Sequence, residues 1–104
     1  MSQDLYGLPQ YDTVRTGEVS GSVTAKQLPT IPAAVIKIKA AISNTGNVYL
    51  GGSGVTKADG TTDITTGIEL DSGEETGWVA LDDLDKLYII CDAATDDIMY
   101  MVLL

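Results

Sequence analysis

The chain has 104 residues, of which 44 % are hydrophobic and 20 % are charged, enough for one domain with one modest core. It contains no histidine and a single cysteine, so the commonest general base, the commonest metal ligand and an internal disulfide are all excluded. No apolar run approaches the roughly 18 residues of a membrane span, and the first residues lack the basic and apolar regions of a secretory signal. We therefore expect a protein without a membrane span, a cofactor, a metal ion or an enzyme activity.

The net charge of −9 is unevenly distributed along the chain. Residues 1–58 carry five basic and three acidic side chains (+2), whereas residues 59–104 carry one basic and twelve acidic ones (−11). Phosphates repel such an acidic protein, so we expect no nucleic acid partner. The asymmetry is typical of a plain soluble surface; alternatively, a weakly basic and a strongly acidic face could dock head-to-tail or onto a charged lattice.

Residues 1–12 are predicted to form an N-terminal arm, followed by a single β-sandwich domain over residues 13–104. The arm contains a glycine, a proline and no hydrophobic period, and such termini become ordered only when other residues hold them. Its apolar side chains are nevertheless too numerous for a solvated tail: Leu5, Tyr6, Leu8 and Tyr11. They either pack back on the core or lie across a neighbouring subunit, and both alternatives stay open.

Alternating apolar and polar residues predict strands in the first half of the domain. The alternation over residues 14–25 predicts a half-buried strand, and two prolines predict a turn or an edge over residues 28–32. The clearest strand covers residues 34–42. Its two faces separate cleanly, with four apolar side chains on one and two lysines on the other: Ile36, Ile38, Ala40 and Ile42 against Lys37 and Lys39.

In the second half, clusters of turn-forming residues alternate with short apolar segments. Gly, Asp, Asn and Ser predict turns at residues 43–47, 51–54, 58–63, 71–74, 82–85 and 92–97. The segments between them predict strands at residues 48–50, 68–70, 78–81, 87–91 and 98–104. We therefore expect an all-β fold, a β-sandwich or jelly-roll-like small barrel of about seven or eight short antiparallel strands.

The last predicted strand is apolar on both faces, although one face of a sandwich strand is normally solvated. One side carries Met99, Met101 and Leu103, which would form an exposed strip of the kind that marks an interface. The alternative is that the arm of residues 1–12 covers this strip, and both hold if a neighbouring subunit donates the arm. We expect a homo-oligomer, with a trimer favoured.

Three groups of residues could carry chemistry, and each has a structural alternative that we favour. The glycine-rich segment 51–54 lacks the Lys-Ser/Thr pair and the helix of a phosphate-binding loop, so we expect a turn or bulge. The acidic segments 59–63 and 82–85 offer oxygen ligands for calcium without the spacing of a calcium loop, so we expect solvated turns. Glu74 and Glu75 are adjacent, so a strand would point them to opposite faces and prevent joint acid–base catalysis.

Two single residues have structural interpretations as well. Cys91 has the parity of Leu87 and Ile89 and is predicted to be an inert core residue, because burial keeps a thiol protonated. Trp78, the only tryptophan, is predicted to be an anchor in the core or in an interface. An exposed platform for a sugar ring is the alternative.

Residues 44–56, which read NTGNVYLGGSGVT, resemble a pattern that is common in small proteins of tailed bacteriophages. Three later segments continue the pattern: SGEET at residues 72–76, DLDKLYIICD at residues 83–92 and IMYMVL at residues 98–103. These motifs are turns and core residues without a catalytic group. Ser72 departs from the pattern, which usually has proline before Gly-Glu, and residues 1–43 do not match it.

The resemblance implies a component of a bacteriophage virion, since similar proteins decorate capsids or form the capsid-proximal parts of head fibres. We expect a capsid decoration (cement) protein that binds the major capsid protein lattice on the outer head surface and stabilises the shell. It would be made in the host cytoplasm and located in the virion. The expected contacts with the capsid or between subunits come from the arm, the lysine face and the last strand: Leu5, Tyr6, Leu8, Tyr11, Lys37, Lys39, Met99, Met101 and Leu103.

Two other functions remain as alternatives. The first is a head-fibre or tail adhesin that recognises a host glycan through Trp78, Tyr49 and the acidic loops. A glycan array would separate this function from capsid decoration. The second is an enzyme, which would require an activity that is lost when a carboxylate such as Glu74 is changed.

Overall fold

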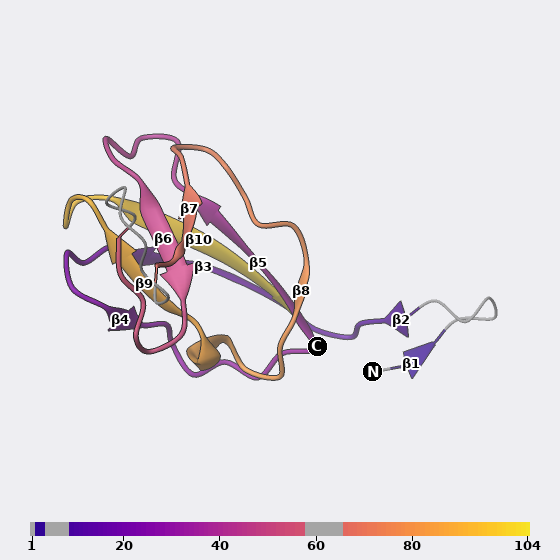
Figure 1. Cartoon of the computed structure of the whole chain (residues 1–104). Coiled ribbons are helices and arrows are strands. Elements are labelled where there is room, and N and C mark those ends of the chain that lie inside the picture. Colours follow the sequence, from indigo (N-terminus) through magenta and orange to yellow (C-terminus); the bar gives the residue numbers. More distant parts are fainter. Residues whose placement is uncertain (1, 4–8, 58–65) are drawn as a thin grey trace.

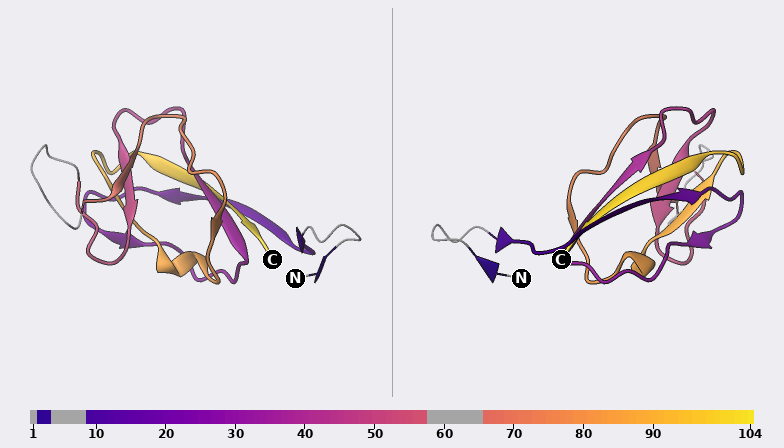
Figure 2. Two further views of the ribbon diagram at one scale, coloured as in Figure 1. Left: turned by 45° about the vertical axis from the view of Figure 1, so that its right-hand side comes forward. Right: turned by 180° about the vertical axis from the view of Figure 1, so that it is seen from behind.

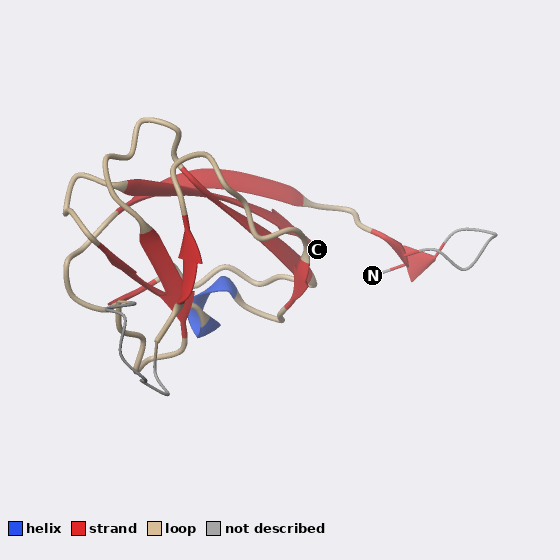
Figure 3. Cartoon of the chain, turned by 45° about the horizontal axis from the view of Figure 1, so that its top comes forward, coloured by secondary structure: helices blue, strands red, loops and turns tan. Residues whose placement is uncertain are grey.

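The computed structural model describes residues 2–3, 9–57 and 66–104, and in these residues the fold is all-β (Figure 1). Two four-stranded antiparallel sheets pack against each other, and a short 3-10 turn, η1 (Leu84–Lys86), contributes the only helical segment within the described ranges. Figure 3 shows this turn beside the strands of the sandwich. The predicted β-sandwich of short antiparallel strands is therefore confirmed. No helix among the described residues is long and apolar enough to span a membrane.

The two sheets differ in strand length, and each is named here by the order of its strands. The strand order of sheet I is β3 (Val14–Ser20), β10 (Asp97–Leu103), β5 (Val35–Ala40) and β8 (Val79–Ala80). Its β3 and β10 are the two longest strands among the described residues. Sheet II has the order β4 (Lys26–Gln27), β9 (Tyr88–Cys91), β6 (Val48–Gly51) and β7 (Ile68–Leu70). Every pairing in both sheets is antiparallel.

The connections run almost entirely between the sheets. Within the two four-stranded sheets, β6 and β7 are the one pair of described strands that are both consecutive in the chain and neighbours in a sheet. The central strand of sheet I, β10, comes from the end of the chain and lies between β3 and β5, which come from its first half. Contacts between distant segments therefore hold the two four-stranded sheets together, and the sandwich is not a row of hairpins.

The core lies between the sheets and follows the alternation of the strands. From β5, Ile36, Ile38 and Ala40 point inward and are completely buried, as predicted, while the lysines between them point outward. Sheet II contributes the same kind of residue to the opposite side of the core, including Ile89 and the predicted core residue Cys91. Each apolar side chain of this size contributes about 1.5–3 kcal/mol when it is removed from water.

One end of the sandwich is closed by η1. Its Leu84 is fully buried, and Asp83 caps it by accepting hydrogen bonds from the backbone N–H groups of Asp85 and Ile31, both at 3.0 Å. This cap joins two distant segments, because Ile31 and Asp83 are 52 residues apart in the chain. The acidic segment 82–85 is therefore a capped structural turn, in agreement with the prediction.

Two predictions about strand length were wrong. The alternation over residues 14–25 predicted one strand, but β3 ends at Ser20, and Val23 and Ala25 are exposed. Where the chain leaves sheet I, the backbone of Gly21 lies against the carbonyl oxygen of Asp96, which leaves no room for a side chain. Ile42 was predicted to belong to the buried face of its strand, but β5 ends at Ala40 and Ile42 is 80 % exposed in the following turn.

The described residues at the N-terminus, 2–3 and 9–10, lie outside the sandwich. Ser2–Gln3 (β1) pairs antiparallel with Pro9–Gln10 (β2), and Figures 1 and 2 show this pair away from the two sheets. The chain joins sheet I where the N–H groups of Asp12 and Thr13 both donate to the carbonyl oxygen of Leu104, each at 2.8 Å. The predicted arm residues Leu5, Tyr6 and Leu8 lie outside the described residues, and Tyr11 is half-buried.

Candidate interaction surface

The outer face of sheet I is formed by the side chains that alternate away from the core. The antiparallel register aligns them across β3, β10 and β5 in three rows, which are Glu18–Met99–Lys39, Thr16–Met101–Lys37 and Val14–Leu103–Val35. In each row, the residue of the central strand β10 lies between its two partners. The outer face is therefore apolar along its middle, acidic or neutral on β3 and basic on β5.

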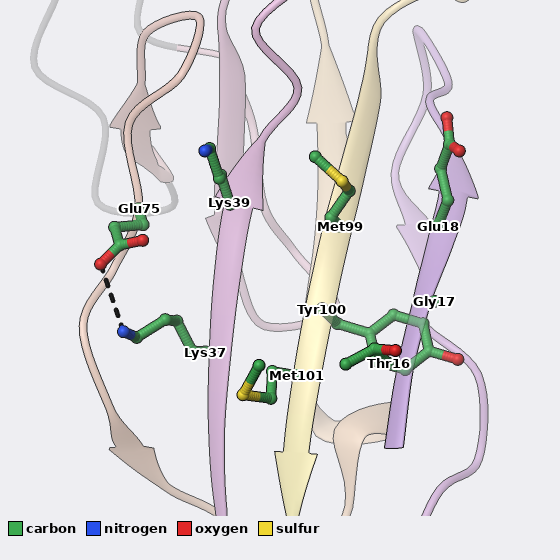
Figure 4. Close-up of a pocket in the computed structure, with 9 residues that line it drawn as sticks. All are labelled: Thr16, Gly17, Glu18, Lys37, Lys39, Glu75, Met99, Tyr100 and Met101. Carbon is green, nitrogen blue, oxygen red and sulfur yellow. Dashed lines mark ion pairs between the residues drawn. The ribbon is translucent and has the colours of Figure 1, made fainter. Parts of the chain in front are cut away.

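This face is open to solvent. Met99 and Met101 are 39 % and 36 % exposed, and Figure 4 shows them on β10 between the lysines of β5 and the β3 residues Thr16 and Glu18. A broad depression of about 540 Å³ lies over them. The prediction that the last strand exposes an apolar strip is confirmed for the two methionines, while Leu103 is half-buried; none of the described segments covers the strip.

The two lysines of this face differ in their surroundings. Lys37 Nζ lies 3.2 Å from Glu75 Oε1 and 4.7 Å from the centroid of the Trp78 ring, so an ion pair and a cation–π contact hold its position. Lys39 lies one row away, and its side chain makes no ion pair or hydrogen bond with any described residue. Glu18, at the other end of the same row, also lacks such a partner within the described ranges.

Gly17 of β3 lies between the outward-facing residues Thr16 and Glu18. It lies opposite Tyr100 in the register, and the aromatic ring of Tyr100 occupies the space that a Cβ atom at position 17 would need (Figure 4). An aromatic ring that covers a cross-strand glycine shields the backbone of an edge strand and pins its register. The same register pairs Thr16 with Met101 and Glu18 with Met99 on the outer face.

The structure brings together most of the predicted contact residues that it describes. Lys37 and Lys39 of β5 lie beside Met99 and Met101 of β10, because these two strands are neighbours. Sequence reasoning missed Glu18, which the same pairing places on the far side of the methionines. Its only signal was the alternation on β3, which does not say which strand β3 will join.

The aromatic residues of the predicted glycan site do not form a common platform. Trp78 is 47 % exposed, so of its two predicted places the core is excluded and an interface stays a prediction, and one partner of its ring is already Lys37. Tyr49 is only 4 % exposed and is therefore not available for stacking on a sugar. Burial raises the pKa of the Tyr49 phenol, and nearby Asp92 and Glu69 act in the same direction.

Of the other candidate sites, segment 51–54 and Glu74–Glu75 have structural roles, and segment 59–63 lies outside the described residues. In segment 51–54 the N–H of Val55 donates to the carbonyl oxygen of Gly52 at 3.0 Å, as expected for a turn. Glu74 accepts a hydrogen bond from the N–H of Asp71 at 2.7 Å, whereas Glu75 pairs with Lys37, so the two carboxylates serve different partners. The acidic segment 59–63 lies outside the described residues, and elsewhere in the description no three Asp, Glu, Cys or His side chains form a potential metal site.

A second cavity of about 430 Å³ lies between the sheets near β7 and β8. Its walls are the inner side chains of both sheets, including Ile36, Ile38 and Leu70, and Glu75 is the one ionisable residue that lines it within the description. A cavity of this composition offers apolar contact and no pair of groups for acid–base chemistry.

Comparisons with models of protein families, with curated proteins and with solved structures each found no match to this chain. The resemblance to small phage proteins thus remains a prediction from the sequence. The outer face of sheet I and the β1–β2 pair outside the sandwich are the two features of the described residues that bear on function.

Proposed function

We propose that this protein is a structural component of a bacteriophage virion, most specifically a capsid decoration protein that binds the outer head surface and stabilises the shell. The observation that carries the proposal is the outer face of sheet I. This face offers two exposed methionines between basic and acidic side chains on a firm sheet. Such a surface suits a large protein partner, because the middle is apolar and adaptable while the rim is charged.

The shape of this surface argues for adhesion rather than for chemistry on a small molecule. The depression over β10 is broad and open, so water reaches every group that lines it. A catalytic site normally excludes water around the reacting groups and gathers convergent polar side chains. The depression around Met99 and Met101 is open to water, and its charged side chains lie on both sides of the methionines rather than around one point.

The energetic requirement of a decoration protein is modest. Burying a methionine side chain fully contributes about 1.5–3 kcal/mol relative to leaving it exposed, so a few such contacts give only weak binding per copy. Many equivalent copies on one lattice multiply this weak contact into a large stabilisation of the shell. The N-terminal segment supports the same function, since its β1–β2 pair stands outside the sandwich and can reach a neighbouring molecule.

Co-sedimentation with empty shells tests the proposal. The shells are assembled from the major capsid protein encoded in the same phage genome. We expect the purified chain to bind at a fixed number of copies per shell and to raise the melting temperature of the shells. A glycan array run in parallel should give no hits. Failure to co-sediment at low salt, or a specific glycan hit, would overturn capsid decoration in favour of an adhesin.

A further inference from the structure

We infer that the outer face of sheet I is covered by the same face of a second copy of this chain, in a dimer whose two-fold axis runs approximately along β10. The inference goes beyond shell binding, because it concerns the isolated protein in solution, where no shell is present to cover this face. It names one occupant for the exposed strip of Met99 and Met101. The closed assembly is then a dimer rather than the trimer that the sequence favoured.

The order of charges within one row supports this occupant. The row Glu18–Met99–Lys39 runs from acidic through apolar to basic. A two-fold axis along β10 keeps each β10 opposite its copy and brings β3 of one chain opposite β5 of the other. Glu18 of each copy then faces Lys39 of its partner, and Met99 faces Met99. Two ion pairs thus flank one apolar contact, as self-complementary interfaces require.

The remaining rows fit the same axis. Val14 faces Val35 across the interface, so the apolar row meets an apolar row. Thr16 faces Lys37, whose charge is already balanced by Glu75 within its own chain. Face-to-face sheets pack about 10 Å apart and rotate by about 30° relative to each other, and flexible methionines can fill the space that this rotation leaves.

The alternative two-fold axis, perpendicular to β10 in the plane of the face, is much less favourable. It would place β3 on β3 and β5 on β5, so that Lys39 would face Val35 and Glu18 would face Val14. Both charged side chains would then lose their hydration and face an apolar side chain, which is strongly unfavourable in free energy. The charge pattern therefore selects one orientation and disfavours the other.

Lys39 and Glu18 are free to make these contacts. Neither side chain has an ion pair or a hydrogen bond with another described residue. Although they share a row, they belong to strands on opposite sides of β10. Across the sheet, their backbones are two strand spacings apart, or about 10 Å. Met99 lies between them, which leaves both charges for a partner.

Charge reversal combined with sedimentation equilibrium tests the dimer. We expect the wild-type chain to dimerise, and Glu18→Lys or Lys39→Glu alone to weaken the dimer at least about tenfold, because like charges then face each other twice. An equimolar mixture of the two single variants should recover the association, since every reversed charge meets an opposite one. Arg15→Glu is the matched control: it reverses an exposed charge on β3 outside the outer face and should leave the dimer unchanged.

Several outcomes would contradict the proposed dimer. A monomer at concentrations up to about 1 mM would overturn it, as would a trimer. A dimer that survives both single reversals, or a mixture that fails to recover association, would show that the outer face is not the contact. Melting curves confirm that each variant is folded. A dimer that ignores shells would overturn only the proposed decoration, and a monomer that binds shells would overturn only the dimer.

Discussion

Gly21 is a residue whose lack of a side chain decides the path of the chain. A Cβ atom at this position would overlap the carbonyl oxygen of Asp96 and would lie 2.8 Å from the sulfur of Cys91. The obstacle is backbone on one side and a fully buried thiol on the other, so neither can move aside cheaply. Glycine is therefore needed where the chain leaves β3 and crosses to sheet II.

We expect Gly21→Ala to lower the free energy of unfolding by about 1–3 kcal/mol, because the added methyl group overpacks this crossing. Urea denaturation measures the difference. Gly52→Ala is the matched control, since a Cβ atom there meets nothing within 4 Å and the change should stay within about 0.5 kcal/mol. Equal effects of the two substitutions would contradict the close packing at Gly21.

Cys91 links burial to the pH dependence of stability. Burial raises the pKa of its thiol above the ordinary value of 9.0, so the native chain keeps this proton to a higher pH than the unfolded chain does. The unfolded chain therefore loses its proton first as the pH rises. The stabilisation is complete below pH 9.0 and falls as the pH rises above it, towards the pKa of the native thiol.

We expect the free energy of unfolding to decrease between pH 8 and pH 10.5 in the wild-type chain, and to decrease less in Cys91→Ala. The variant itself is less stable at every pH because it leaves a cavity. Only the slope with pH is therefore informative, and urea titrations at several pH values measure it. Tyr49, whose pKa is also raised, affects both proteins alike. Identical slopes would show that the thiol does not contribute.

At the scale of single residues, alternation predicted the core well where a strand continues and failed where it stops. Ile36, Ile38 and Cys91 are buried as predicted, because each lies inside a strand on the side of the core. Ile42 has the same parity as Ile38 but lies beyond the end of β5. Tyr49 shows the opposite case, since it alternates away from the core and is buried nevertheless.

At the scale of elements, the sequence predicted where strands and turns occur but not which strands become neighbours. Turn chemistry and period two are local signals, and they located β5, β6, β9 and β10 within a few residues. The pairing of β10 with β3 and β5 depends on contacts across most of the chain, which no local pattern encodes. For this reason Lys39 and Met99 were both foreseen as contacts, whereas their common row with Glu18 was not.

The turns that follow β5 and precede β10 are tied together by one buried carboxylate. Asp96 accepts hydrogen bonds from the backbone N–H groups of Thr45 at 2.9 Å and Gly46 at 3.2 Å. Asn44 adds a reciprocal pair with the backbone of Asp97, at 2.8 Å in each direction. These contacts join residues about fifty positions apart and fix the ends of two neighbouring strands.

We expect Asp96→Ala to lower the free energy of unfolding by about 1–3 kcal/mol, because two backbone N–H groups lose their acceptor in a buried place. Thermal melting measures the loss. Asp92→Ala is the matched control: its carboxylate accepts a hydrogen bond from the N–H of Asn47 at 2.9 Å, but it is exposed and water can replace it. Equal losses in the two variants would mean that burial of Asp96 is not what makes its bonds important.

At the scale of the whole molecule, the asymmetry of charge along the chain becomes a separation in space. The acidic residues of the second half concentrate in the turns around residues 71–75, 82–85 and 92–97. The outer face of sheet I instead carries Lys37 and Lys39 from the first half, with Glu18 and Glu75 beside them. A protein built in this way can bury its outer face without bringing most of its negative charge into the contact.

The sandwich and the N-terminal segment are separable on the same grounds. Among the described residues, the buried core begins at Val19, and β1 and β2 pair only with each other. The first backbone hydrogen bonds to sheet I come from Asp12 and Thr13. The segment before residue 12 therefore adds little to the stability that the two sheets generate between them.

We expect a chain that lacks residues 1–11 to keep its free energy of unfolding within about 0.5 kcal/mol of the full chain and to dimerise with unchanged affinity, because it retains the core and the outer face. Its binding to capsid shells should fall, since the segment that stands outside the sandwich is lost. Thermal melting, sedimentation equilibrium and co-sedimentation measure the three quantities on one preparation. A large loss of stability would mean that the segment packs on the sandwich, and shell binding at full strength would mean that the lattice contact lies on the sandwich itself.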